Sequence, residues 1–539
     1  MLPAITFYAL LFFAVLVLPA AMILAVLFFI EYERRLWQHP KPGPGLTALR
    51  GAGSRAAVQL QMRFPRTARF LTRRLDPKTP WGLPASLAAA VIFVGTWFFL
   101  GVLQDIAARD PLVVLDLRLH NVVPLFRTEG MTRFMLVLTQ LGGAAVLILL
   151  STGAALRALS QGQRRLAATW ALALTGSGLV TASLKALFGF ARPIDALIGI
   201  DQGSFPSGHM LSSTVVYGLF AALLLGRRNG KLERATGVTL LLLLIVGIGL
   251  SRLYLGVHWP SDLLGSMALA LILLAALLFF LFYGGTIRWV DSFILPRGTG
   301  ALQIAGNLAL ALALPAAVAL FIRAEQMPAE PPPPALPLDI TGLRSAWPSG
   351  MPRWSEDLIG GRMEPVSLVL VGSRDEIAAA FTRAGWRLGD LPTPVRVMQE
   401  AIAALRNLPD PTGPATPAFV MDRPQGMTFE KQDPSDASIR RRHHSRLWQT
   451  QYCVAASCRP VWVATASFDV GIRLSEGSYL PTHRIDPELD AERKLIETDL
   501  TGVGVVRWGR VPVSPPMRGK NAAGDPFWTD GAAVVLVMP

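Results

Sequence analysis

The feature that most constrains this chain is a series of apolar stretches, each about twenty residues long and nearly free of charge. A helix of that length spans the hydrocarbon core of a bilayer, because each residue adds about 1.5 Å of rise. Eight stretches qualify, at roughly residues 5–30, 81–103, 131–155, 167–188, 209–226, 235–251, 263–284 and 301–322. The sequence therefore predicts an all-α polytopic membrane bundle of about eight transmembrane helices.

The composition agrees with a chain that is largely surrounded by lipid. Of its 539 residues, 52% are hydrophobic and 16% are charged, whereas soluble proteins carry about 25% charged residues. Lysine and arginine exceed aspartate and glutamate by 51 to 37, which gives a formal net charge of +14. These basic residues concentrate between the apolar stretches, where they suit an anionic membrane surface rather than a nucleic acid.

The basic residues also predict an orientation, since cytoplasmic connections of membrane proteins accumulate lysine and arginine. The segment 31–80 is rich in arginine, and the basic connections near 157–166, 227–234 and 288–297 fall on the same side. The remaining connections (104–130, 189–208 and 252–262) and everything after the last stretch then face outward. In a bacterium this predicts the inner membrane, with the C-terminal part in the periplasm. Within 31–80, FPRTARFLTRRL predicts an amphipathic helix at the membrane surface.

The chain changes character after residue 322. A proline-rich linker precedes a long region in which apolar and polar residues alternate among frequent Pro and Gly, which predicts a soluble α+β domain. The run at 5–30 is too long for a signal peptide, so we expect a retained helix. The predicted organisation is an N-terminal transmembrane helix (1–30), a basic cytoplasmic segment (31–80), a six-helix core (81–284), a connection and last helix (285–322), the linker (323–337) and the soluble domain (338–539).

Two groups of polar residues stand out in the soluble domain. If the domain is exported, a disulfide between Cys453 and Cys458 is expected over free thiols. A second group admits two interpretations, a metal or catalytic cluster and a solvated, salt-bridged surface. We favour the surface because no spacing imposes a coordination geometry. The residues concerned are His444, His483, Asp486, Asp490 and Glu492.

Three segments place charged residues at the ends of the most apolar stretches, all on the predicted outward side: KALFGFARP (185–193), PSGH (206–209) and SRLYLGVHWPSD (251–262). Lys185, Arg192 and Arg252 supply three cations, and a guanidinium presents a planar fork that matches phosphate oxygens. Ionisable residues at membrane depth usually serve a function. These residues therefore predict a site for a phosphoryl group.

The same segments contain the groups that phosphoryl transfer requires. Ser207 and Gly208 stand at the start of a helix, where backbone N–H groups favour an anion. His258 and Asp262 are four residues apart, so the carboxylate can orient the imidazole and leave its other nitrogen free to attack. His209 can protonate a departing oxygen. Because fixed cations would stabilise the transferred group, we expect no metal or other cofactor.

This pattern resembles the signature of the type 2 phosphatidic acid phosphatase family and, more remotely, of vanadium haloperoxidases. Lys, six residues, Arg-Pro; Pro-Ser-Gly-His; and Ser-Arg, five residues, His, three residues, Asp are all present. The resemblance covers about 81–284 and implies a six-helix core with His258 as nucleophile, Asp262 as its partner and His209 as general acid. The phosphate ligands that it implies are Lys185, Arg192, Ser207, Gly208, Ser251 and Arg252.

Some of these residues have plainer alternatives. The Ser251 hydroxyl can instead form a local hydrogen bond, and Lys185 and Arg192 can extend to lipid headgroups. Tyr254 and Trp259 are expected to be interfacial anchors rather than substrate contacts. These alternatives explain single residues better than they explain the spaced set.

The C-terminal region resembles the LssY-type C-terminal domain, which accompanies membrane phosphatases of this sort. The segments that carry the resemblance are RHHSRLW (442–448), ASFDVGI (466–472) and HRIDPELDAER (483–493). The resemblance covers roughly 338–539 and implies a fused module without an assigned chemistry. We expect this module to bind a periplasmic partner or an envelope component.

These observations predict a metal-independent membrane phosphatase that hydrolyses a lipid phosphate or pyrophosphate through a phosphohistidine. Undecaprenyl pyrophosphate, phosphatidic acid and phosphatidylglycerol phosphate fit the resemblance, and an outward-facing site favours the first. Two alternatives remain: a lipid phosphotransferase that uses the same site, and a non-catalytic anionic-lipid binding or transport protein.

Overall fold

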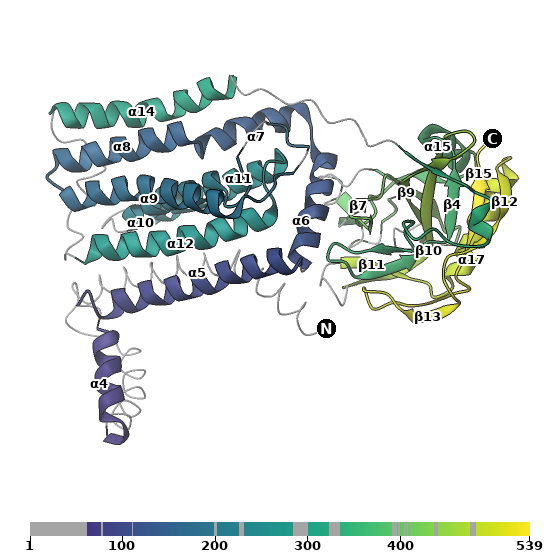
Figure 1. The fold of residues 1–539 in the computed structure, drawn as a ribbon, viewed down its shortest axis with the longest axis horizontal. Helices are drawn as coiled ribbons and strands as arrows, with labels where there is room; N and C mark the ends of the chain where they lie inside the picture. The colour runs from purple at the N-terminus through teal and green to yellow at the C-terminus, as the bar shows by residue number, and fades with distance from the viewer. Residues whose placement is uncertain are drawn as a thin grey trace. The chain divides into compact units, whose positions relative to one another are not determined.

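The computed structural model describes residues 62–539, apart from 77–78, 110, 194, 199–201, 226–230, 284–299, 323–334, 391–395, 397–398, 401, 404–405, 407, 411, 436–439 and 475–480. The predicted span at 5–30 and most of the basic segment lie outside the described residues. The chain forms two compact units (Figure 1), and each is described by itself. One is helical; the other combines residues 109–127 with the C-terminal region.

The helical unit contains the long helices that the apolar stretches predict. Among the described residues, five helices are long and apolar enough to cross a membrane, or up to six if one bent pair counts as a single span. The five are α5 (Leu83–Ala108), α9 (Arg164–Phe188), α10 (Gly208–Leu225), α11 (Lys231–Tyr254) and α12 (Pro260–Phe282). A multi-pass helical bundle is therefore confirmed, while the total of about eight spans stays a prediction.

The predicted span at 131–155 is two helices, α7 (Glu129–Leu141) and α8 (Ala144–Ser160), bent by 40°. The break falls at Gly142 and Gly143, where the sequence offers the least resistance to leaving the helix. A Cβ on Gly142 would lie 2.6 Å from the Ile248 side chain, so only glycine allows α11 to approach this closely. The bend therefore follows from local packing.

The last helix, α14 (Ala301–Ile322), packs against α8 through small residues. A Cβ on Gly153 would lie 2.8 Å from the Gly306 carbonyl oxygen, and a Cβ on Gly306 would lie 2.7 Å from the Gly153 oxygen. Small residues at such crossings let membrane helices approach through their backbones. This contact accounts for two glycines within otherwise apolar stretches.

α10 forms the centre of the bundle. Its residues Leu211, Val215, Val216 and Leu219 are fully buried and pack in one cluster with Trp170 of α9. A helix that is apolar on all sides is enclosed by its neighbours. The amino end of α10, which carries Gly208 and His209, is thereby held inside a ring of other helices.

The second unit is built on a nine-stranded mixed sheet, so the predicted soluble α+β domain is observed as a strand-rich domain. Its main path is β12 (Val506–Pro512), β15 (Ala532–Val537), β4 (Leu368–Val371), β10 (Pro460–Leu474), β9 (Arg442–Val454), β8 (Met427–Gln432) and β5 (Arg387–Leu388). β1 (Leu336–Leu338) pairs with β9 in parallel, and β11 (Pro481–Ile485) pairs with β10. β1 thus begins inside the predicted linker, whose residues up to 334 lie outside the described part.

Helices α15 (Arg374–Arg383) and α17 (Leu489–Gly502) contribute to an apolar core over this sheet with Phe429, Leu447 and Trp462. Two smaller sheets complete the unit: β3 (Arg362–Pro365), β2 (Trp354–Glu356), β6 (Phe419–Val420) and β7 (Arg423–Pro424), and the pair β13 (Met517–Lys520) and β14 (Pro526–Thr529). A 3₁₀ turn spans Gly342–Arg344.

Residues 109–127, predicted as an outward connection, contain α6 (Pro111–Val122) and the 3₁₀ helix η2 (Val123–Phe126). Arg118 of α6 is 2% exposed. Its guanidinium donates to the Asp422 carboxylate at 3.0 Å and to Glu356, and it lies over the Phe419 ring. Asn121 donates to the Asp422 carbonyl at 2.8 Å. α6 is therefore an integral part of this unit.

Candidate active site

The three polar segments meet at one end of the helical unit. Lys185 is in the last turn of α9, His209 in the first turn of α10, and Arg252 in the last turn of α11. Loop contacts join them: the Trp259 indole donates to the Ala191 carbonyl at 2.9 Å, and the Leu197 amide donates to the Leu255 carbonyl at 2.9 Å. The spatial convergence that the sequence predicts is present.

His258 and Asp262 form the central pair. His258 Nδ1 lies 3.0 Å from Asp262 Oδ2, and both side chains are 2% exposed. The same carboxylate oxygen accepts the Trp259 backbone N–H at 2.9 Å, and Oδ1 accepts the Ser204 hydroxyl at 3.3 Å. Three donors thus hold the carboxylate in place at the first turn of α12, where the helix dipole also favours its negative charge.

The other ring nitrogen of His258 faces Arg192, with Nε2 3.3 Å from Arg192 Nη1. A guanidinium can only donate hydrogen bonds, so Nε2 must accept one from Arg192. Nδ1 then carries the ring proton and donates a hydrogen bond to Asp262. This tautomer leaves a lone pair on Nε2, directed toward a cation. The arrangement suits an imidazole that attacks an electrophile with negatively charged substituents.

Of the predicted cations, Arg192 contacts this nitrogen, and Lys185 shares the Gly203 carbonyl with Arg192. Arg192 donates to the carbonyls of Gln202 at 2.7 Å and Gly203 at 3.1 Å, and Lys185 also donates to the Gly203 carbonyl. Arg252 is 2% exposed; its Nη1 donates to Thr139 Oγ1 at 2.8 Å, whereas its Nε is buried without a hydrogen-bond partner among the described residues. Lys185, Arg192 and Arg252 all act electrostatically on His209 and His258.

The PSGH segment is held in place by a side chain of α12. The Ser207 backbone N–H donates to Ser266 Oγ at 2.7 Å, and that hydroxyl donates to the Asp262 carbonyl at 2.6 Å. Ser207 Oγ is buried and has no hydrogen-bond partner in the part of the chain that the structure describes. A Cβ on Gly208 would lie 3.1 Å from Thr181, so glycine allows close packing on α9. Ser207 therefore offers its hydroxyl, rather than its N–H, to a ligand.

One of the predicted phosphate contacts takes the plainer alternative in this structure, and two predicted anchors make further contacts. Ser251 is fully buried and donates to the Ile248 carbonyl at 2.6 Å, so its role as a phosphate contact stays a prediction. The Tyr254 hydroxyl accepts the Thr128 N–H at 3.1 Å and contacts Thr132 at 2.9 Å. Tyr254 and Trp259 thus tie loops together rather than only anchor the protein at the interface.

Sequence reasoning missed Thr139, Ser204 and Ser266, which hold Arg252, Asp262 and the PSGH segment respectively. Ser266 follows Asp262 by four residues, and this spacing is the one signal that places it on the same helical face. Thr139 and Ser204 belong to other elements, and nothing in their local sequence distinguishes them from ordinary hydroxyl residues.

In the second unit, His444 and His483 lie around Asp469, which was not among the polar residues that the sequence singled out. Asp469 is fully buried; its Oδ1 lies 3.0 Å from His444 Nδ1 and its Oδ2 lies 3.3 Å from His483 Nδ1. His444 Nε2 lies 2.8 Å from Ser467 Oγ. Burial lowers the pKa of His444 and raises the pKa of Glu430 to about 8. Ser467 is also fully buried, so a substrate cannot reach it.

The predicted solvated surface is therefore wrong for His444 and Glu492, which are 2% and 5% exposed. Glu492 accepts from His443 at 2.9 Å, while Asp490 holds Thr529 at 2.8 Å, so these residues do not share one centre. The described residues contain no group of three or more His, Cys, Asp or Glu side chains placed to hold a metal ion. Cys453 and Cys458 are free thiols, and the expected disulfide is absent.

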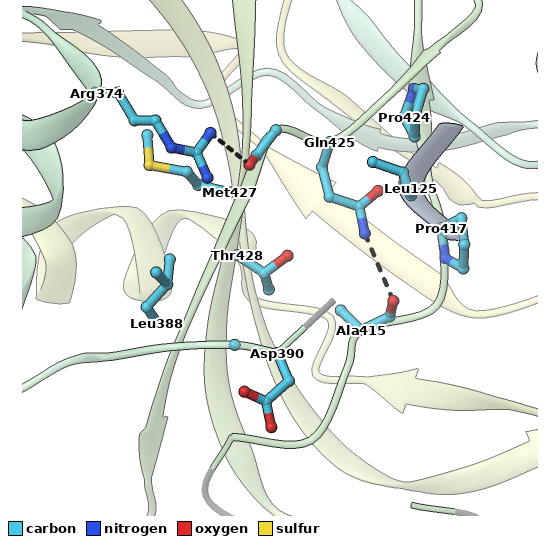
Figure 2. Close-up of a pocket in the computed structure, with 12 residues that line it drawn as sticks. Leu125, Arg374, Leu388, Asp390, Ala415, Pro417, Pro424, Gln425, Met427 and Thr428 are labelled. Atoms are coloured by element: carbon cyan, nitrogen blue, oxygen red, sulfur yellow. Dashed lines mark hydrogen bonds between the residues drawn. The ribbon is translucent and has the colours of Figure 1, made fainter. Parts of the chain in front are cut away.

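One pocket of about 130 Å³ in this unit is drawn in Figure 2. Its polar groups are already satisfied by the protein: Arg374 donates to the Gly426 carbonyl at 2.9 Å, and Asp390 accepts from Thr412 at 3.1 Å. Leu125, Leu388 and Pro417 supply apolar walls. With no free charged group and little volume, this pocket does not compete with the His258 site.

The fold and the site define a membrane protein whose buried His–Asp pair faces fixed cations. Comparison with known families agrees. Residues 166–285 match the PAP2 superfamily model, and residues 349–533 match the LssY C-terminus model. The chain therefore contains a PAP2 superfamily domain and an LssY C-terminal domain, which confirms both resemblances.

Three proteins that are similar to this chain in sequence carry the names of phosphatases. A candidate undecaprenyl-diphosphatase of Escherichia coli (strain K12) is 36% identical over 116 residues, which are 20% of this chain and 54% of that protein. A decaprenylphosphoryl-5-phosphoribose phosphatase of Mycobacterium tuberculosis is 40% identical over 91 residues, 16% of this chain and 45% of that protein. Phosphatidylglycerophosphatase B of Bacillus subtilis is 38% identical over 87 residues, 15% of this chain and 38% of that protein.

The chain thus spans about half the length, or less, of the curated relatives it matches. Among solved structures, a transmembrane PAP2-type phosphatidylglycerolphosphate phosphatase from Bacillus subtilis aligns with a TM-score of 0.29 and 21% identity. That alignment covers 35% of this chain and 93% of the other chain.

Proposed function

We propose that this protein is an integral-membrane phosphatase that hydrolyses a lipid phosphate or pyrophosphate through a phosphohistidine, without a metal. The observation that carries the proposal is the His258–Asp262 pair, 3.0 Å apart, with Nε2 of the same imidazole turned toward Arg192. A binding or transport protein needs the cations but has no use for an imidazole oriented in this way.

In the first step, His258 Nε2 attacks phosphorus and forms an N–P bond while the P–O bond to the leaving group breaks. The bound phosphate offsets the charge of the three cations, so that His209 can hold the proton that it gives to the leaving oxygen, which is an alcohol for a monophosphate or a lipid phosphate for a pyrophosphate. Asp262 stabilises the positive charge that His258 acquires. In the second step, His209 takes a proton from water, water attacks phosphorus, and the N–P bond breaks to release inorganic phosphate.

Charge on the transferred group is the main demand of phosphoryl transfer, and fixed cations meet it without a metal ion. Arg252 and Ser207 contribute a buried N–H and a buried hydroxyl that no other described group occupies. Lys185 and Arg192 are partly exposed and reach the same region through the Gly203 carbonyl. These groups are preorganised, so little reorganisation accompanies binding of the phosphate.

The substrate proposed is an anionic lipid whose headgroup enters this site while its tail remains among the helices. Undecaprenyl pyrophosphate is the substrate that we prefer. This preference rests on the expected orientation: the basic segments predict that the site faces the periplasmic side of a bacterial inner membrane. The names of the relatives, which include a polyprenyl diphosphatase and a phosphatidylglycerophosphatase, support the class of lipid phosphates. The C-terminal domain is proposed to bind a periplasmic partner or an envelope component.

Phosphate release from purified protein in detergent tests the proposal. The panel contains undecaprenyl pyrophosphate, phosphatidic acid and phosphatidylglycerol phosphate, each with EDTA present and without an acceptor lipid. We expect release in EDTA, loss of release in His258→Ala, and unchanged release in Ser213→Ala. Ser213 is a matched control, because it is buried in the same helix as His209 and donates only to the Met210 carbonyl.

Two results would overturn the proposal. Undiminished turnover by His258→Ala would exclude His258 as the nucleophile, and loss of all activity in EDTA would contradict the metal-independent step. Loss of phosphate from the substrate only when an acceptor lipid is added, with that lipid phosphorylated and no inorganic phosphate released, would instead favour a phosphotransferase at the same site.

A further inference from the structure

The helix α4 (Pro65–Arg74) has an apolar stripe of which three of the four side chains are exposed. Phe64, Ala68, Leu71 and Leu75 recur at spacings of four and three, which places them on one face. Phe64, Leu71 and Leu75 are 52%, 38% and 58% exposed, whereas Ala68 between them is 7% exposed. Exposed apolar side chains of this size are unfavourable in water, so Phe64, Leu71 and Leu75 require an apolar environment.

The opposite face of α4 is basic. Arg66, Arg69 and Arg73 lie about half a turn from the apolar stripe, and the helix contains no acidic residue. Arg74 lies over the Phe70 ring, with 5.5 Å between the guanidinium carbon and the ring centroid. An apolar stripe beside uncompensated arginines is the pattern of a helix that lies in the interface of an anionic bilayer.

The placement of α4 relative to the bundle agrees with that environment. Figure 1 shows α4 crosswise to α5 and extending away from the helices that cross the membrane. A tight turn sets this direction: the Leu83 amide donates to the Asp76 carbonyl at 2.9 Å, and the Ser86 hydroxyl donates to the Arg74 carbonyl at 2.8 Å. A Cβ on Gly82 would lie 2.0 Å from the Asp76 oxygen, so the turn requires glycine.

An aromatic pair marks the level at which α4 leaves the bundle. Trp81, in the same turn, packs edge-on against Tyr283 at 5.5 Å between ring centroids, and the two side chains are 62% and 44% exposed. Tryptophan and tyrosine collect where the hydrocarbon core meets the headgroups. A helix that leaves crosswise at this level runs along the headgroup layer.

We propose that α4 is a surface-lying helix that binds an anionic phospholipid headgroup layer, with Leu71 in the acyl region and Arg69 among the headgroups. The proposal does not depend on the proposed catalytic function. Each arginine at an anionic surface strengthens association by about fivefold. The three arginines of the basic face thus make the position of the helix dependent on lipid charge.

The experiment uses the full-length protein in nanodiscs of phosphatidylcholine, with or without phosphatidylglycerol. Cys453 and Cys458 are replaced by serine, and a fluorophore is placed by Leu71→Cys or, as the matched control, by Arg69→Cys. Iodide in water and a quencher attached to the lipid acyl chain report the two environments. In discs with phosphatidylglycerol we expect the label at position 71 to be quenched by the lipid and protected from iodide, with the reverse at 69.

Charge dependence is tested with Arg66→Gln combined with Arg73→Gln in the Leu71→Cys protein. We expect this pair of substitutions to lower lipid quenching in phosphatidylglycerol discs toward the value in pure phosphatidylcholine. Equal iodide access at 71 and 69 would overturn the proposal. Protection of position 71 from both quenchers would also overturn it, since another part of the chain or a second copy would then cover the stripe.

Discussion

The most informative perturbation lies in the C-terminal unit, where Arg442 sits among three carboxylates. Its guanidinium lies 2.8 Å from Glu430, 3.3 Å from Asp469 and 3.3 Å from Glu400, and its side chain is 3% exposed. Arg442→Met preserves most of the volume but leaves these acids without their cation. Breaking a buried ion pair by removing one partner destabilises a protein by about 3–5 kcal/mol, so we expect this loss in the free energy of unfolding.

That magnitude can be measured by hydrogen exchange of the full-length protein in nanodiscs, followed on peptides from β9 and β10. A loss of about 3–5 kcal/mol speeds the slowest amides of these strands by about a hundredfold or more, because they exchange through unfolding of the domain. The matched control is Arg510→Met: Arg510 pairs with Asp530 at 2.9 Å, but the two side chains are 45% and 37% exposed. A solvent-screened pair of this kind contributes about 0–1 kcal/mol.

A second substitution tests the electrostatic cause. Glu400→Gln in the Arg442→Met protein removes one of the unpaired charges and should recover part of the lost protection. Exchange in Arg442→Met no faster than in Arg510→Met would refute the reasoning. A double variant that exchanges faster than the single Arg442→Met protein would refute it equally.

Three further predictions follow from the same contacts. Asp262→Asn should lower phosphate release by about ten-thousandfold, because the amide can hold His258 in the wrong tautomer; an activity near that of the unmodified protein would contradict the role of the carboxylate. Burial raises the pKa of Glu430 to about 8, so the folded domain holds a proton that the unfolded chain has released, and stability falls as the pH rises toward 8. In Glu430→Gln, the stability read from hydrogen exchange, after correction for the intrinsic exchange rate, should no longer fall between about pH 6.5 and 8. An unchanged slope of stability against pH would assign the titration to another group. Arg118→Met should cost about 1 kcal/mol, because its acceptors Glu356 and Asp422 are 37% and 36% exposed and water replaces the lost contacts; this is seen as faster proteolysis at the β6–β7 turn, and unchanged proteolysis would show that α6 is not held there.

Much of the helical unit is predictable from the sequence, because lipid allows few solutions. A long apolar stretch must satisfy its backbone hydrogen bonds within itself, so it forms a helix whatever surrounds it. The spacing of His258 and Asp262 likewise implies their contact, since residues four apart share a helical face. The break at Gly142 was not foreseen, because it depends on the close approach of Ile248, which is distant in sequence.

The strand-rich unit was less predictable for a related reason. The alternation of apolar and polar residues along β9 places Leu447 on one face of the strand and His444 and Arg446 on the other. It does not reveal that both faces of the strand are covered. Charged residues in a strand are usually exposed, and the expectation of a solvated surface follows that rule. It fails here because Asp469, on β10, lies 3.0 Å from His444 and Glu364, on β3, pairs with Arg446 inside the domain.

In the candidate active site, Ser266 links the PSGH segment to the start of α12. The Ser207 N–H is engaged by Ser266, whose own hydroxyl donates to α12 next to the Asp262 side chain. The loop that carries His209 and the helix that orients His258 are therefore joined by one side chain. In the proposed mechanism the two imidazoles flank the same phosphorus atom, so a shift of one relative to the other would disrupt both proposed steps. Ser266 links these two segments through its single hydroxyl, so Ser266→Ala should lower phosphate release more than it lowers stability.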